Sequence, residues 1–101
     1  MADILIVEDK TSFAEVLKSA LDDTNFTTLI AKTGREAIQI FKREKINLVL
    51  LDLRLPDIDG IDVLRELKNI DSDAKFIIMT AFGTIERAVE AMKLGACDFL
   101  T

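Results

Sequence analysis

Ile4-Leu5-Ile6-Val7 is a short, unbroken run of apolar and mostly β-branched residues. Such a run is typical of a β-strand that is buried on both faces, as in a parallel sheet with helices on each side. The pattern returns over 47–51 and 76–79, in a milder form over 27–31, and as a short stub over 98–100. The sequence therefore predicts five strands, with the milder one at an edge of the sheet.

Amphipathic helical patterns separate the predicted strands. Ser12 with Glu15 and Thr33 with Glu36 fit the capping box, in which two side chains satisfy free backbone donors at the start of a helix. Strand and helix therefore alternate, which favours an α/β fold with right-handed crossovers and helices on both faces. We expect one domain over 1–101, a doubly wound five-stranded parallel sheet.

The composition argues against several classes of function. The chain has 101 residues, with 13 Lys and Arg against 18 Asp and Glu and a net charge of -5, whereas direct nucleic-acid binding needs an excess of basic residues. It contains no histidine, which excludes Ser-His-Asp catalysis, and its one cysteine, Cys97, excludes an internal disulfide. No apolar run approaches the roughly 20 residues of a membrane span. We expect a cytoplasmic domain with no membrane partner.

One face of the predicted sheet lacks a cover. Thr101 closes the last predicted strand, and no helical pattern follows it, whereas a doubly wound sheet normally buries both faces. We interpret the chain as a fragment of a longer protein, with the final helix missing. The alternative is a minimal domain that covers the bare face by self-association.

Carboxylates and a hydroxyl follow three of the predicted strands. Glu8 and Asp9 follow the first strand, Asp52 the third and Thr80 the fourth, and the strand order 2-1-3-4-5 would bring them to one rim, where ligands of such sheets bind. Carboxylates this close repel one another unless a cation neutralises them, and oxygen ligands suit Mg²⁺. The backbone carbonyl of Arg54 is a further candidate ligand. A carboxylate in such a site can attack phosphorus, and the Thr80 hydroxyl can donate a hydrogen bond to a phosphoryl oxygen.

Three other kinds of site fit these residues less well. A dinucleotide or flavodoxin-type site needs a Gly-, Ser- or Thr-rich loop after the first strand, where Glu8-Asp9-Lys10 stands. A haloacid-dehalogenase-type phosphatase needs a second Asp at position 54, which is Arg54. A calcium loop that begins at Leu55 lacks its first ligand. Lys10 and Arg87 are expected to be ordinary surface charges.

The motifs together resemble the receiver domain of two-component response regulators. The matching stretches are 4–9, 51–60, 79–83 and 88–100, and they follow the family's order along the whole chain. The last two are most similar to receivers of the nitrogen-regulation type, whose outputs are ATPase activators of transcription.

The resemblance implies a role for each acidic position. Asp52 would accept a phosphoryl group from the phosphohistidine of a sensor histidine kinase. Asp9 would bind Mg²⁺ directly and Glu8 through water, and the Arg54 carbonyl would complete the protein ligands. The family implies self-catalysed phosphoryl transfer and autodephosphorylation within a signalling domain, and no further enzymatic activity. A receiver-like module that is not phosphorylated is the alternative.

The resemblance also implies a switch. Thr80 would bind the phosphoryl group and move inward, small Ala81 would leave room for it, and aromatic Phe99 would swing inward as Thr80 moves. The change would alter the surface of the helix over 85–92 and the strand over 98–100, and so regulate a downstream, DNA-binding output domain. Homodimers or higher oligomers could form through this surface or the uncovered sheet face.

One family residue is absent from this sequence. Receivers carry an essential Lys at the end of the fifth strand, and here it would be the first residue after Thr101. We therefore expect Asp52 to remain open to phosphorylation while signalling is poor. We also expect the bare sheet face to destabilise the chain or to drive oligomerisation.

Overall fold

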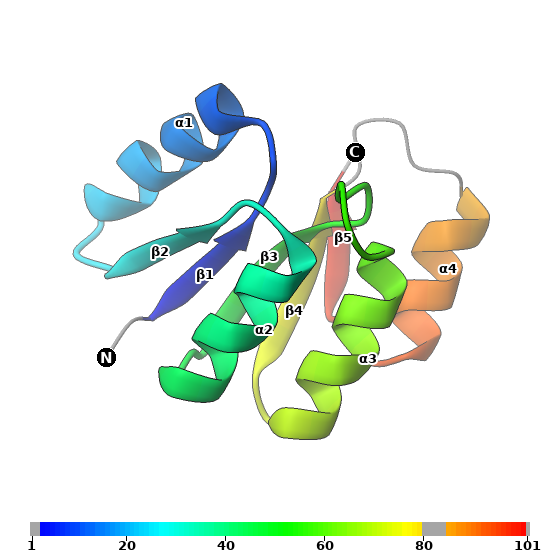
Figure 1. The fold of residues 1–101 in the computed structure, drawn as a ribbon. Coiled ribbons are helices and arrows are strands. Elements are labelled where there is room, and N and C mark those ends of the chain that lie inside the picture. Colours follow the sequence, from blue (N-terminus) through cyan, green and yellow to red (C-terminus); the bar gives the residue numbers. More distant parts are fainter. Residues whose placement is uncertain (1–2, 80–84, 101) are drawn as a thin grey trace.

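The computed structural model describes residues 3–79 and 85–100. Strands and helices alternate from the first element to the last (Figure 1). None of the helices in this described part has the length and apolar character that a membrane span requires. The elements are β1 (Ile4–Val7), α1 (Thr11–Asp22), β2 (Thr28–Ala31), α2 (Gly34–Arg43), β3 (Leu48–Asp52), α3 (Gly60–Ile70), β4 (Lys75–Met79), α4 (Ile85–Lys93) and β5 (Asp98–Leu100).

The strands form one parallel five-stranded sheet in the order β2-β1-β3-β4-β5. This confirms the predicted α/β fold and its strand order. The third strand extends one residue beyond the predicted apolar run, so that Asp52 is its last residue. Val7 is in register with Leu51, and Asp52 with Met79. The carboxyl ends of β1, β3 and β4 therefore lie next to one another at one edge of the sheet.

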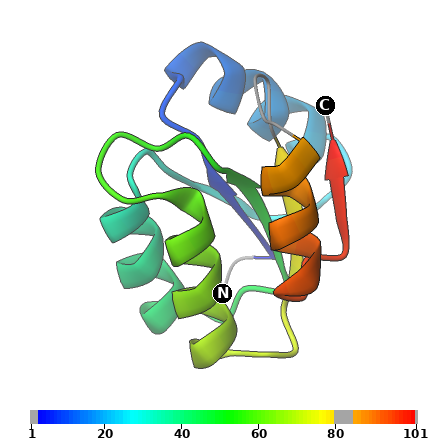
Figure 2. The same ribbon diagram turned by 90° about the vertical axis from the view of Figure 1, so that its right-hand side faces the viewer.

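Helices cover the two faces of the sheet unequally. Figures 1 and 2 show α2, α3 and α4 on one face and α1 on the other. Successive strand residues alternate between the faces, so that Leu5 and Val7 join the core under three helices, whereas Ile4 and Ile6 join the core under α1. Most of the buried side chains belong to the three-helix face. The buried members of the α1 core are Ile4, Ile6, Ala14, Leu50 and Met79.

The α1 face exposes apolar side chains in the described part of the chain. Val16 of α1 is 65% exposed, and Phe13 is 44% exposed. Leu100 of β5, whose register partner Met79 belongs to the α1 core, is also exposed. This side of the sheet is therefore thinly covered among the described residues.

The capping boxes have different outcomes. Thr33 is the N-cap of α2, its Oγ1 accepts a hydrogen bond from the N–H of Glu36, and Glu36 in turn accepts from the N–H of Lys32. The predicted cap at Ser12 is wrong. Helix α1 begins one residue before Ser12, and its N-cap is Lys10, which makes no side-chain capping hydrogen bond. Ser12 therefore lies inside the first turn, past the position from which a hydroxyl caps a helix.

Candidate functional site

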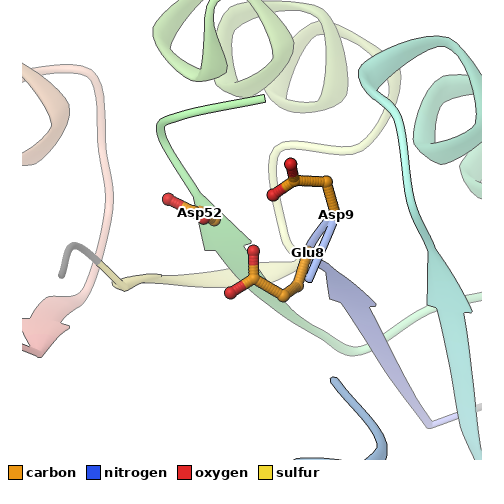
Figure 3. A group of neighbouring side chains, drawn as sticks. All are labelled: Glu8, Asp9 and Asp52. Atoms are coloured by element: carbon orange, nitrogen blue, oxygen red, sulfur yellow. The ribbon is translucent and has the colours of Figure 1, made fainter. Parts of the chain in front are cut away.

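Three predicted site residues come together where β1 and β3 end. Glu8 and Asp9 follow β1, and Asp52 is the last residue of the neighbouring strand β3. One carboxylate oxygen from each side chain lies within 4.8 Å of the other two. Figure 3 shows the three side chains as neighbours at the ends of the two strands. The parallel pairing of two strands thus gathers three acidic groups that are far apart in sequence.

Glu8 is the most unusual of these groups. Its side chain is buried, with 4% of the residue exposed, and its Oε2 has no hydrogen-bond partner among the described residues. Burial, and secondly the neighbouring Asp52 carboxylate, raise the pKa of Glu8 to about 8. A buried carboxylate oxygen without a donor is energetically unfavourable in its ionised form. A cation next to Oε2 would remove that penalty.

The donor set fits a hard divalent cation. All three side chains offer carboxylate oxygens, and Mg²⁺ prefers oxygen ligands while it keeps several waters. Asp9 is exposed and Asp52 is half-buried, so the cluster is open to water and to an anionic ligand on one side. The residues present therefore fit Mg²⁺, and the unpartnered Oε2 of Glu8 is the observation that favours it.

The backbone after β3 folds back onto the strand. Oδ1 of Asp52 accepts a hydrogen bond of 3.0 Å from the N–H of Arg54, and the N–H of Gly60 donates to the carbonyl of Leu53 at 3.0 Å. A Cβ atom at Gly60 would lie 2.4 Å from Cα of Leu53, which is closer than real Cβ contacts. Only a residue without a side chain permits this approach. The end of the loop after Asp52 is therefore held against its own first residue, Leu53, next to the end of β3.

Two aspartates attach the same loop to helix N-termini. Asp57 accepts hydrogen bonds from the N–H groups of Gly34 (2.8 Å) and Arg35 (3.0 Å) at the start of α2. Asp59 is the N-cap of α3 and accepts from the N–H of Ile61 at 2.9 Å. Neither residue was predicted from the sequence to help position the site. Asp59 stands directly before a helical pattern, which is a readable N-cap signal, whereas the contact of Asp57 with α2 is tertiary and has no local signal.

Arg87 was expected to be an ordinary surface charge, but it has a specific partner. Its Nη2 donates to Oδ1 of Asp59, which joins α4 to the end of the β3–α3 loop. The hydrogen bond from Arg87 is the main reason why the pKa of Asp59 lies below its usual value. The pair therefore holds two charged groups close together across two helices.

The structure describes some of the remaining predicted residues and not others. Thr80 and Ala81 lie outside the described residues. Phe99 of β5 is 40% exposed. It is in register with Ile78, which belongs to the core under α2, α3 and α4, so Phe99 lies on that face of the sheet. Arg54 is exposed, and the role of its carbonyl stays a prediction.

Comparison with known proteins identifies the family. A family model described as the response regulator receiver domain matches residues 4–101. The chain belongs to this receiver domain family. It is therefore a signalling domain of two-component systems, as the resemblance implied.

The relatives are regulatory proteins. The chain is 46% identical over 95 residues to the regulatory protein LuxO of Vibrio cholerae, covering 94% of this chain and 21% of that protein. It is 38% identical over 98 residues to the transcriptional regulatory protein ZraR of Escherichia coli, covering 97% of this chain and 22% of that protein. The chain thus spans about a fifth of the length of these curated relatives.

A solved structure supports the fold. The response regulator TrrA of Thermotoga maritima in complex with Mg²⁺-BeF is similar, with a TM-score of 0.88 and 30% identity. The similarity covers 100% of this chain and 86% of that one.

Proposed function

We propose that Asp52 accepts a phosphoryl group from the phosphohistidine of a sensor histidine kinase in a Mg²⁺-dependent reaction. The convergence of Glu8, Asp9 and Asp52 at the ends of β1 and β3 carries this proposal. Membership of the receiver family supports it, and so does the absence of a histidine that could serve as acceptor instead.

Asp52 is the nucleophile in this reaction. One of its oxygens, Oδ1, accepts a hydrogen bond from the N–H of Arg54. The other oxygen, Oδ2, is left to attack phosphorus. A new O–P bond forms as the N–P bond of the kinase phosphohistidine breaks, and the imidazole leaves with the electron pair. The product is an aspartyl phosphate. Its later hydrolysis by water returns the carboxylate and releases phosphate.

The other acidic residues prepare the site. Asp9 and Asp52 would hold Mg²⁺ directly and Glu8 through water, with the Arg54 carbonyl as a further ligand. The ion, when bound, offsets the negative charge that gathers on the phosphoryl oxygens. The similar TrrA structure contains Mg²⁺-BeF, which supports the same ion and a phosphoryl-like ligand here.

The readout that we propose involves α4 and β5. Thr80 would bind the phosphoryl group, with Ala81 leaving room, and Phe99 would move inward as Thr80 does. The described part of this surface presents the exposed side chains of Ile85 and Val89. We propose that it regulates a DNA-binding output domain in the cytoplasm, directly or through homodimers, which the description of ZraR as a transcriptional regulatory protein supports.

Intact mass spectrometry tests the assignment of Asp52. The chain is incubated with a small-molecule phosphodonor, with and without Mg²⁺, beside the variant Asp52→Asn. We expect one phosphoryl adduct that requires Mg²⁺ and is absent from the variant. Absence of the adduct from this chain and from one that continues past Thr101 would overturn the proposal, and would favour a receiver-like module that is not phosphorylated.

A further inference from the structure

Helix α4 is held by few apolar contacts. Its buried residues are Ala88 and Ala91, and alanine side chains bury little apolar area. Its large apolar side chains face outward in part, with Ile85 82% and Val89 44% exposed. We therefore expect polar contacts to add to the small apolar contribution that keeps this helix in place.

The ion pair between Arg87 and Asp59 is one polar contact at the start of α4. Arg87 lies in the first turn of the helix, and its guanidinium donates to Oδ1 of Asp59. The same oxygen accepts a hydrogen bond from the N–H of Ile61 at the start of α3. The pKa of Arg87 is raised, first by this hydrogen bond, as expected for a charge that Asp59 stabilises.

The two partners belong to parts of the molecule that differ in rigidity. Asp59 ends a loop that is attached to Leu53, the first residue after β3, through Gly60, and to α2 through Asp57. Arg87, by contrast, lies on the thinly anchored helix. A bond between a fixed loop and a loosely held helix resists any displacement of that helix.

The path from the phosphoacceptor leads to the same helix. Asp52 is in register with Met79, the last residue of β4. Residues 80–84 join Met79 to Ile85, the first residue of α4, along the sequence. A group added to Asp52 therefore lies beside the strand that leads directly into α4.

We propose that the Arg87–Asp59 ion pair holds α4 in its unphosphorylated position and thereby weakens the response of the site to phosphorylation. Arg87 is a positioning residue in this scheme and makes no contact with the phosphoryl group. The inference rests on the proposed function of Asp52. In this scheme the ion pair is stretched or broken when the domain switches.

Beryllofluoride with Mg²⁺ provides the test, because it mimics a phosphoryl group on a carboxylate. Its binding is titrated by fluorine NMR for the unaltered chain, Arg87→Gln, Asp59→Asn and the double variant. Asn is also a good N-cap, so Asp59→Asn keeps the start of α3. Each single variant is expected to tighten binding about threefold, because the binding-competent arrangement is more populated. The double variant is expected to match either single variant.

Two controls separate this role from general stability. Arg35→Gln removes a longer ion pair, 3.9 Å to Asp57, at the other side of the same loop, and is expected to leave the beryllofluoride midpoint unchanged. Arg87→Lys retains the charge and is expected to shift the midpoint less than Arg87→Gln. Thermal unfolding of every variant is measured in parallel to verify that each one is folded.

The outcomes are distinct. Unchanged or weaker binding in both single variants would overturn the role of the pair, and so would effects that multiply in the double variant. If the unaltered chain, and a chain extended past Thr101, bind no beryllofluoride, the proposed function of Asp52 fails and the inference fails with it. Binding by the unaltered chain without any change in the variants overturns the inference alone.

Discussion

Helices α3 and α4 cover the same face of the sheet and contact each other, but different interactions hold them. Helix α3 buries several large side chains in the core, among them Leu64 and Leu67, and Asp59 caps its start. Helix α4 buries Ala88 and Ala91, and an ion pair to that same cap joins its first turn to α3.

This difference separates a framework from an element that can respond. Helix α3 is anchored in the core, and its capped start attaches the loop that follows Asp52, so we expect this part of the molecule to change little when a ligand binds. Helix α4 buries only small side chains among the described residues, so we expect less free energy to be needed to displace it than to displace α3. A conformational switch needs both kinds of element, because one element must move relative to another that stays in place.

Truncating side chains in the two helices should give the largest contrast. Leu64→Ala removes a fully buried side chain of α3 and is expected to lower the free energy of unfolding by about 3 kcal/mol. Ile85→Ala in α4 removes a side chain that is 82% exposed, with an expected change below about 0.5 kcal/mol. Urea unfolding followed by circular dichroism measures both. Equal losses of unfolding free energy would contradict the difference in anchoring between α3 and α4.

The loop next to α3 should be equally intolerant of added volume. Gly60→Ala would place Cβ 2.4 Å from Cα of Leu53, a backbone atom, so the loop must shift, and we expect a loss of about 2 kcal/mol and slower phosphorylation of Asp52. Gly34→Ala is the matched control at the start of α2, because its closest contact is the side-chain Cγ2 of Val63 at 2.8 Å. Unfolding free energies and phosphodonor rates are compared. A larger effect at Gly34 would contradict the role given to the loop.

The buried carboxyl of Glu8 should make the fixed part of the molecule sensitive to pH. Its pKa is raised from 4.5 to about 8 in the folded chain, so between these values the folded state retains a proton that the unfolded state loses. The stabilising contribution is complete below the lower value and is lost as the pH rises toward about 8. Without Mg²⁺, the free energy of unfolding is therefore expected to fall from pH 5 to pH 8.

Glu8→Gln is the matched variant, because glutamine has nearly the same shape and does not ionise. Its pH profile is expected to be flatter, and at pH 8 it should be about 1 kcal/mol more stable than the unaltered chain. Urea unfolding in the presence of a chelator measures both chains. A parallel fall in stability in the two proteins would assign the pH dependence to other groups.

The smallest effect is expected at a second ionic contact between the two helices. Arg65 of α3 bonds Asp62 at 2.9 Å and lies 3.6 Å from Glu90 of α4, with about half of its side chain exposed. Exposed pairs contribute little and are screened by salt, so Arg65→Gln should change stability by less than about 0.5 kcal/mol. Thermal unfolding at low and high salt measures it. A loss comparable with that of Leu64→Ala would show that polar contacts also anchor α3.

The sequence predicted the elements whose signals are local. Apolar runs such as Ile4–Val7 located the strands, and the alternation with helical patterns led to the parallel sheet. The acidic residues were predicted to meet because each follows a strand, and parallel strands end at one edge. The extra strand residue, Asp52, was missed because a polar residue ends the apolar pattern although its backbone still pairs with Met79.

The contacts that position the site were beyond local patterns. Asp57 reaches the start of α2, which is 23 residues away, and Arg87 reaches Asp59 across 28 residues. Such pairings depend on how α2, α3 and α4 pack against one another. The spacing of residues in the sequence does not predict this packing. The cap at Ser12 failed for a smaller reason, since α1 starts one residue early and Ser12 lies within its first turn.

Hydrogen exchange of α3 and α4 amides, with and without phosphorylation at Asp52, tests whether α4 responds to phosphorylation while α3 stays fixed. The chain is compared before and after treatment with Mg²⁺ and a phosphodonor, with Asp52→Asn treated in the same way. We predict that exchange in α4 changes severalfold, that exchange in α3 does not, and that the variant shows neither change. Equal changes in both helices, or a change in α3 alone, would contradict the account.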